Sequence, residues 1–184
     1  MKICVALLLL FVAGCSTKAD PPMYGTAPAF SFTERSGREV QSSELAGKVW
    51  VADFIFTSCA GACPVMTEKM RALQEKLPPE IRLVSFTVDP ERDTPETLRS
   101  YAERAGADRE RWLFLTGNKE ALYKLSIEGF KLGVDDAAGT PAEPITHSTR
   151  FVLVDREGRI RGYYGMEDET ALERLEEDAT GLLH

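Results

Sequence analysis

The sequence predicts an α/β domain in which a mixed central sheet is flanked by helices and preceded by an N-terminal β-hairpin. Apolar runs of strand length alternate with helical segments between residues 49 and 129, which indicates strands joined by covering helices. Two hairpin-like pairs of strand segments, one before and one after this region, add antiparallel strands. The chain has 184 residues, of which 43% are hydrophobic, so we expect one domain with a substantial core.

The first elements along the chain are a hairpin and a buried strand. Residues 30–32 (FSF) and 39–41 (EVQ) flank the polar turn 35–37 (RSG), which is typical of a hairpin. Residues 49–56 (VWVADFIF) form a nearly continuous apolar run, as expected for a strand that is buried on both faces.

A helix is predicted from Pro64 to about Leu77. Four apolar side chains recur at helical spacing and form one stripe: Met66, Met70, Leu73 and Leu77. We interpret the two methionines as core residues rather than thioether ligands. Pro78 and Pro79 end the helix because proline lacks the backbone N–H that a helix interior needs.

The next strand, residues 81–88 (IRLVSFTV), is followed by a helix with Thr94 as its N-cap, Pro95 at its first position and Gly106 as its stop. The remaining predicted elements are a short buried strand at 112–116, a helix from Asn118 to about Gly129, a second hairpin formed by 151–154 and 160–164 around the turn 155–158, and a closing helix at 171–183.

The overall charge argues against one class of partner. The formal net charge is −7 and the isoelectric point is near 5.0. Nucleic-acid binding rests on clustered lysine and arginine against phosphate, so we expect no nucleic-acid partner.

The N-terminus predicts export and a lipid anchor. A short positive start is followed by an apolar run that is too short to span a membrane and fits a signal peptide. The small residues before Cys15 resemble the lipobox of bacterial lipoproteins, in which the peptide is cut before a cysteine that is then acylated. We therefore expect a signal peptide at 1–14, lipidation of Cys15, a flexible tether at 15–27 and a folded domain at 28–184. The predicted location is the periplasmic face of a bacterial membrane.

Two cysteines remain in the folded part, Cys59 and Cys63, at the turn between a strand and a helix. With Pro64 at the first helical position, Cys63 would lie near the N-cap, where the helix dipole lowers a thiol pKa and favours the thiolate. Side chains four residues apart on a helix are separated by more than a disulfide allows, which favours a shared metal ion. A looser turn would still permit a reversible disulfide, so the spacing leaves both possibilities open.

His147 is the candidate third ligand, because the other histidine, His184, is the last residue of the chain. It precedes the strand at 151–154. Two thiolates and one imidazole suit Cu(I), Cu(II) or Zn(II). An open zinc site would call for a substrate cleft with acid–base groups, which the sequence does not reveal.

A chain that ends β-β-α and carries cysteines at a strand-to-helix turn is similar to the thioredoxin fold. Four stretches resemble the Sco/SenC family, the copper-binding thioredoxin-like proteins of cytochrome c oxidase assembly: DFIFTSCAGACPVMT (53–67), FTVDPERDTPETLRSYAERAG (86–106), WLFLTG (112–117) and THSTRFVLVDREGRIRGYYG (146–165).

The resemblance implies a copper site formed by Cys59, Cys63 and His147. It implies delivery of copper to the copper A centre of oxidase subunit II, or to another extracytoplasmic copper protein, and reduction of the cysteines of that centre. Asp89 and Asp93 match the acidic block of the family, and we interpret both as turn and capping residues.

Two alternatives use the cysteines without metal. A thiol–disulfide oxidoreductase would need redox-active Cys59 and Cys63 but not His147. A peroxiredoxin-like peroxidase, suggested by the hairpin entrance and the Cys-Pro pair, ranks last.

Overall fold

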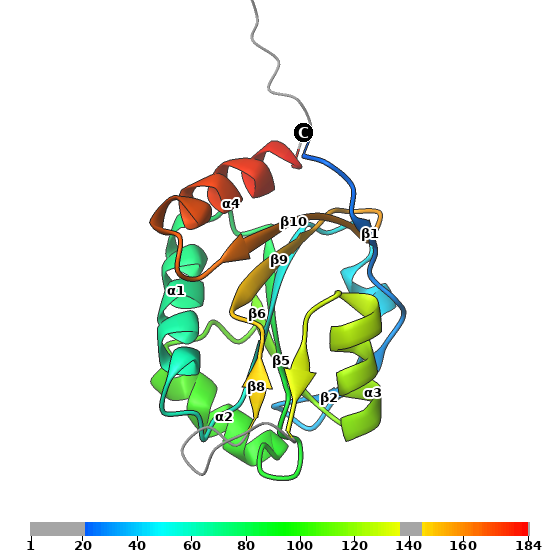
Figure 1. Ribbon diagram of the computed structural model, residues 1–184, viewed down its shortest axis with the longest axis vertical. Coiled ribbons are helices and arrows are strands. Elements are labelled where there is room, and N and C mark those ends of the chain that lie inside the picture. The colour runs from blue at the N-terminus through cyan, green and yellow to red at the C-terminus, as the bar shows by residue number, and fades with distance from the viewer. Residues whose placement is uncertain (1–20, 137–144, 184) are drawn as a thin grey trace, which may run out of the picture.

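The computed structural model describes residues 21–136 and 145–183, and it confirms the mixed α/β fold (Figure 1). One eight-stranded sheet has the strand order β1-β10-β9-β4-β5-β6-β2-β3. Its strands are β1 (Gly25–Thr26), β2 (Ser31–Glu34), β3 (Glu39–Gln41), β4 (Trp50–Ile55), β5 (Arg82–Thr87), β6 (Trp112–Thr116), β9 (Arg150–Val154) and β10 (Arg159–Gly165). A separate pair joins β7 (Val134–Asp135) to β8 (Thr146–His147).

The three central strands β4, β5 and β6 are parallel, and all the other pairings in the sheet are antiparallel. Helices α1 (Ala62–Lys76) and α4 (Glu169–Gly181) lie on one side of the sheet, and α3 (Lys119–Lys124) lies on the other (Figure 1). Helix α2 (Pro95–Arg104) crosses from β5 to β6, and the short turns η1 (Ser42–Leu45) and η2 (Leu125–Gly129) complete the fold. None of these helices is long and apolar enough to cross a bilayer.

Local signals in the sequence place most element ends correctly. Thr94 caps α2 by accepting a hydrogen bond from the backbone of Thr97, and Gly106 follows the helix with a φ of +68°. Asn118 caps α3 in the same way, accepting from Ala121 at 2.9 Å. The predicted helix to Gly129 ends in η2, a wider π-helical turn.

The core is aromatic on the α3 side of the sheet. The rings of Phe54 and Phe86 stack with centroids 5.2 Å apart, and Phe130 meets Trp50 and Phe54 edge to face. On the α1 side, the predicted methionine stripe is buried, with Met66 and Met70 fully inaccessible. The interpretation of these methionines as core residues is therefore confirmed, and the packing fixes α1 against β4.

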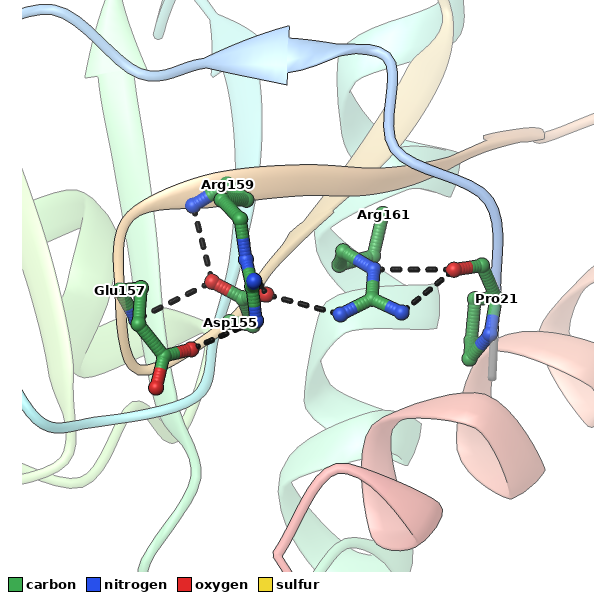
Figure 2. A network of polar contacts seen from close by, with 5 residues as sticks. All are labelled: Pro21, Asp155, Glu157, Arg159 and Arg161. Atoms are coloured by element: carbon green, nitrogen blue, oxygen red, sulfur yellow. Dashed lines mark hydrogen bonds and ion pairs between the residues drawn. The ribbon is translucent and has the colours of Figure 1, made fainter. Parts of the chain in front are cut away.

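The segment at 21–27 was expected to belong to a flexible tether, but here it is attached to the sheet. Tyr24 donates its backbone N–H to Ile160, and Ala27 donates to Gly158. The Arg161 guanidinium binds the carbonyl of Pro21 and, at 2.9 Å, the carboxylate of Asp155 (Figure 2). Contacts with the domain thus begin at Pro21, ahead of the expected boundary at residue 28, while residues 15–20 lie outside the described part.

Candidate metal centre

Three side chains from distant parts of the chain converge beyond the carboxyl end of β4. Cys59 lies in the loop after β4, Cys63 in the first turn of α1 and His147 in β8. The two sulfur atoms and a ring nitrogen all lie within 4.8 Å of one another. Neither cysteine is in a disulfide. The structure therefore brings together the three residues that the sequence singled out, whereas Cys15 and His184 lie outside the described residues.

Cys63 is buried, and a backbone hydrogen bond fixes its sulfur. Its Sγ accepts a hydrogen bond of 3.4 Å from the backbone N–H of Phe56, the residue that follows β4. Helix α1 begins at Ala62 with Gly61 as the N-cap, so the prediction that Pro64 occupies the first position and Cys63 the cap is wrong by two residues. Pro64 is still tolerated, because the backbone N–H groups of the first turn have no partner within the helix.

The expected lowering of the Cys63 pKa is also wrong. Burial raises the pKa of this thiol well above its ordinary value, although the Phe56 N–H opposes the shift. The helix N-terminus favours the thiolate by only about 1 kcal/mol, and the loss of water around a fully buried sulfur outweighs it. Without a metal, Cys63 is therefore a thiol that can donate to an acceptor.

Cys59 is half-buried, and its sulfur lies within 4.8 Å of the sulfur of Cys63 and of a ring nitrogen of His147. Its backbone N–H donates to the Phe56 carbonyl at 3.3 Å, closing a tight turn. Its Sγ accepts, at 3.5 Å, from the backbone N–H of Cys63. The loop thus turns both sulfurs toward each other, and Cys59 is the less buried of the two cysteines.

His147 completes the group, and its hydrogen bonds orient its ring. Strand β8 pairs with β7, which places His147 opposite Val134. Nδ1 lies 3.0 Å from the carbonyl of Ser148, which can only accept, so Nδ1 carries the proton. In the neutral ring Nε2 then holds a lone pair, and it lies 3.1 Å from Sγ of Cys63. A ring fixed in this tautomer is ready to bind a metal ion.

Phe56 shields the ring from one side, with its centroid 5.6 Å from that of His147 and the rings nearly perpendicular. The same residue donates its N–H to Cys63 and accepts the N–H of Cys59. Phe56 therefore links all three candidate ligands through one position at the end of β4.

Asp93 has a role that the sequence did not reveal. Its carboxylate is fully buried and accepts from the N–H of Thr57 at 3.1 Å and from the hydroxyls of Thr57 and Thr87 at 2.5 Å each. Burial raises the pKa of this carboxyl against those hydrogen bonds. Asp93 does close the expected turn, donating its backbone N–H to the carbonyl of Asp89 at 2.9 Å, and its carboxylate in addition ties the cysteine loop to the end of β5.

The donor set fits a soft metal ion. A first-row ion bonded to thiolates at about 2.3 Å and to imidazole at about 2.0 Å holds its ligands about 3.5–4.5 Å apart, so the observed spread needs only small side-chain movements. Two sulfurs and one imidazole are ligands that suit copper or zinc. Because both sulfurs and Nε2 already converge, binding does not require the backbone to rearrange.

Comparison with known proteins places this geometry in context. Residues 19–180 match the SCO1/SenC family model. The chain is 36% identical over 169 residues to the SCO1 protein homolog of Bacillus subtilis, which covers 88% of this chain and 86% of that protein. It is 33% identical over 151 residues to a Stutzerimonas stutzeri protein whose name refers to copper binding, covering 77% and 70% of the two chains. The crystal structure of a SCO1/SenC family lipoprotein from Bacillus anthracis matches with a TM-score of 0.79 and 35% identity, covering 87% of this chain and 96% of that one.

Proposed function

This chain belongs to the SCO1/SenC family, and from that premise we propose that it is a membrane-anchored extracytoplasmic copper metallochaperone. It binds one copper ion through Cys59, Cys63 and His147 and delivers it to the copper A centre of cytochrome c oxidase subunit II or to another extracytoplasmic copper protein. The observation that carries this proposal is the position of Nε2 of His147, 3.1 Å from the buried sulfur of Cys63.

The site favours exchange over permanent storage. Three ligands leave copper with room for an incoming donor, and one of them, Cys59, is half-buried rather than enclosed. A thiolate of the acceptor can therefore enter while Cys63 and His147 still hold the ion. A closed four-ligand site, as in structural zinc proteins, would resist such exchange.

The attachment of residues 21–27 favours a definite orientation at the membrane. Strand β1 pairs with β10, where Gly25 lies opposite Ile160. Ile160 lies opposite Val154 of β9, and Val154 lies opposite Trp50 at the amino end of β4. Cys59 and Cys63 follow β4 in the chain, and their sulfurs and a ring nitrogen of His147 lie within 4.8 Å of one another, so the metal ligands gather beyond the opposite, carboxyl end of β4. With Cys15 lipidated, only the short stretch from Cys15 to Pro21, at most about 20 Å when extended, separates lipid from domain, so the copper site faces away from the bilayer.

Copper titration tests the binding site. The full chain with Cys4 and Cys15 replaced by serine, purified in detergent, should bind one equivalent of Cu(II) and develop thiolate-to-copper charge-transfer absorption. His147→Ala should lose or shift these bands and weaken binding by at least tenfold, whereas Thr146→Ala, at the exposed neighbouring position, should not. Unchanged bands and affinity in His147→Ala would show that the site is assigned wrongly.

The two free, neighbouring thiols favour a second candidate, a thiol–disulfide oxidoreductase. Cys59 thiolate would attack a target disulfide, Cys63 would resolve the mixed disulfide, and the two electrons released by forming the Cys59–Cys63 bond would reduce the target. Reduction of a disulfide substrate that persists in His147→Ala and in the presence of a copper chelator would favour this candidate. Loss of activity under both conditions would favour the copper carrier.

A further inference from the structure

A groove of about 230 Å³ opens beside the metal centre, between α1 and α2. Its wall includes Cys59 and Pro64 from the α1 side and Tyr101 and Arg104 from α2. Cys63 and His147 are not part of this wall. Of the three candidate ligands, Cys59 alone is therefore presented to a molecule that lies in the groove.

The two charged residues of the groove differ in their ion pairing: Glu68 has an arginine partner, and Arg104 has no carboxylate partner among the described residues. The Glu68 carboxylate is paired with Arg71 at 2.6 Å, and Glu75 shares the same arginine. The Arg104 guanidinium lies 5.9 Å from the centroid of the Tyr101 ring, and the Tyr101 hydroxyl is 2.7 Å from that of Thr67. Within residues 21–136 and 145–183, no carboxylate pairs with Arg104. The groove thus combines an aromatic platform with one cation that lacks a counter-charge.

We propose that this groove is the docking site for the cysteine-bearing segment of the acceptor, and that an acidic residue next to the acceptor cysteine pairs with Arg104. This inference rests on the proposed function and adds the route by which the partner arrives. An acidic side chain complements the free guanidinium, and a bidentate pair with arginine also fixes orientation. The acceptor sulfur then meets Cys59 first.

The route also sets the order of ligand exchange. The incoming thiolate replaces Cys59, the less buried of the two cysteines, while Cys63 and His147 keep the ion until the acceptor supplies further ligands. The same groove would guide a thiol–disulfide exchange at Cys59, because the approach is governed by the surface rather than by the metal.

A peptide-exchange assay without copper tests the groove itself. The chain carries Cys4→Ser, Cys15→Ser and Cys63→Ser, which leaves Cys59 as its only thiol. The probe is acetyl-Gly-Glu-Cys-Glu-Gly-amide, its cysteine joined to thionitrobenzoate by a disulfide, with versions in which both glutamates are glutamine or lysine. Cys59 thiolate attacks the peptide sulfur, forms the protein–peptide disulfide and releases thionitrobenzoate, whose absorbance gives the rate.

The glutamate peptide should react about tenfold faster than the lysine peptide, with the glutamine peptide between them. Arg104→Glu should reverse this order, and Arg104→Gln should reduce the difference to about twofold. The matched control is Arg109→Glu, an equal charge change at an exposed site outside the groove. Raised salt should shrink the preference, because exposed charges are screened.

An order of rates that survives both Arg104 variants would overturn the proposal, and so would equal effects of Arg104→Glu and Arg109→Glu, which would reveal only overall charge. Because copper is absent, the result is independent of the titration above. A chain that binds no copper could still show the peptide preference, and a copper-binding chain could lack it.

Discussion

Nε2 of His147 lies 3.1 Å from Sγ of Cys63, although 84 residues separate the two along the chain. The fold therefore brings the proposed ligands together, and copper binding should stabilise the native state. At a free copper concentration a thousandfold above Kd the stabilisation is about 4 kcal/mol, which raises the Tm of a chain of this size by about 8–16 °C. Calorimetry with and without copper measures this shift. In His147→Ala, a tenfold weaker affinity lowers the stabilisation to about 2.7 kcal/mol, so the shift should fall by at least a third, whereas a full shift in that variant would contradict the assigned site.

The two cysteines should differ in reactivity. Cys59 is half-buried, whereas Cys63 is fully buried and burial raises the pKa of its thiol. We expect iodoacetamide to modify Cys59 in the Cys63→Ser variant at least tenfold faster than Cys63 in the Cys59→Ser variant. Mass spectrometry of the quenched reaction gives both rates, with Cys4 and Cys15 replaced by serine in each chain. Equal rates would mean that the loop opens readily and that the order of ligand exchange proposed above is wrong.

The Asp93 carboxylate should be needed for both stability and metal affinity. Asp93→Ala leaves the N–H of Thr57 and the hydroxyls of Thr57 and Thr87 without their acceptor. A fully buried donor without a partner costs about 1–3 kcal/mol. Because Thr57 is only partly buried, we expect a total loss of about 2–4 kcal/mol in the free energy of unfolding. Because Thr57 begins the cysteine loop, copper affinity should also fall by about tenfold.

Denaturant unfolding and competitive copper titration measure the two effects of Asp93→Ala. Glu91→Ala is the matched control, since Glu91 is exposed on the same loop. If both variants keep wild-type stability and affinity, the loop does not depend on the Asp93 contacts.

The parts of the fold that follow from local patterns could be predicted from the sequence. The buried run at 49–56 contains β4, and Thr94, Pro95 and Gly106 mark the ends of α2, because caps and apolar runs act over a few residues. The start of α1 could not be placed, since its N-cap, Gly61, makes no side-chain hydrogen bond.

Contacts between residues far apart in the sequence were harder to predict. The meeting of His147 with Cys59 and Cys63 was expected, because His184 is the last residue of the chain and the family resemblance implied the same three ligands. The burial of Cys63 and the link from Asp93 to Thr57 were not, because both depend on how β4 and β5 pack in three dimensions. An acidic residue in the loop after a strand is interpreted as a turn residue when its distant partners are unknown.

The clamp on the N-terminal segment should hold residues 21–27 to the domain. Arg161 is buried and joins Asp155 to the carbonyl of Pro21 (Figure 2). Arg161→Met removes the partner of Pro21 and one of the two arginines that bind Asp155. Arg159 still pairs with that carboxylate at 2.7 Å, so we expect a loss below the value of about 3–5 kcal/mol for a buried charge left without any partner. We expect hydrogen exchange at the amides of Tyr24 and Ala27 to accelerate at least tenfold. Arg156→Met, at an exposed position in the neighbouring turn, is the control and should leave these amides protected.

Asp53 should make stability depend on pH near neutrality. Its carboxyl is fully buried in β4, with Oδ1 accepting from Ser85 at 2.6 Å, and burial raises its pKa to about 7. In the unfolded chain an aspartate has a pKa near 4, so between these values the native state binds the extra proton. Stability is then greatest at low pH within this range and falls as the pH rises through 7.

For a single carboxyl with these two pKa values, the loss between pH 5 and pH 8 is about 2–3 kcal/mol. Asp53→Asn removes the ionisation and should flatten the dependence of the unfolding free energy on pH in this range. The stability of the variant relative to the wild type therefore increases as the pH rises. Urea unfolding at a series of pH values measures the difference, with Glu173→Gln on the exposed side of α4 as the control. The comparison isolates Asp53, because the three chains are identical apart from the substituted position. Parallel profiles for wild type and Asp53→Asn would mean that the Asp53 carboxylate finds compensation inside the sheet.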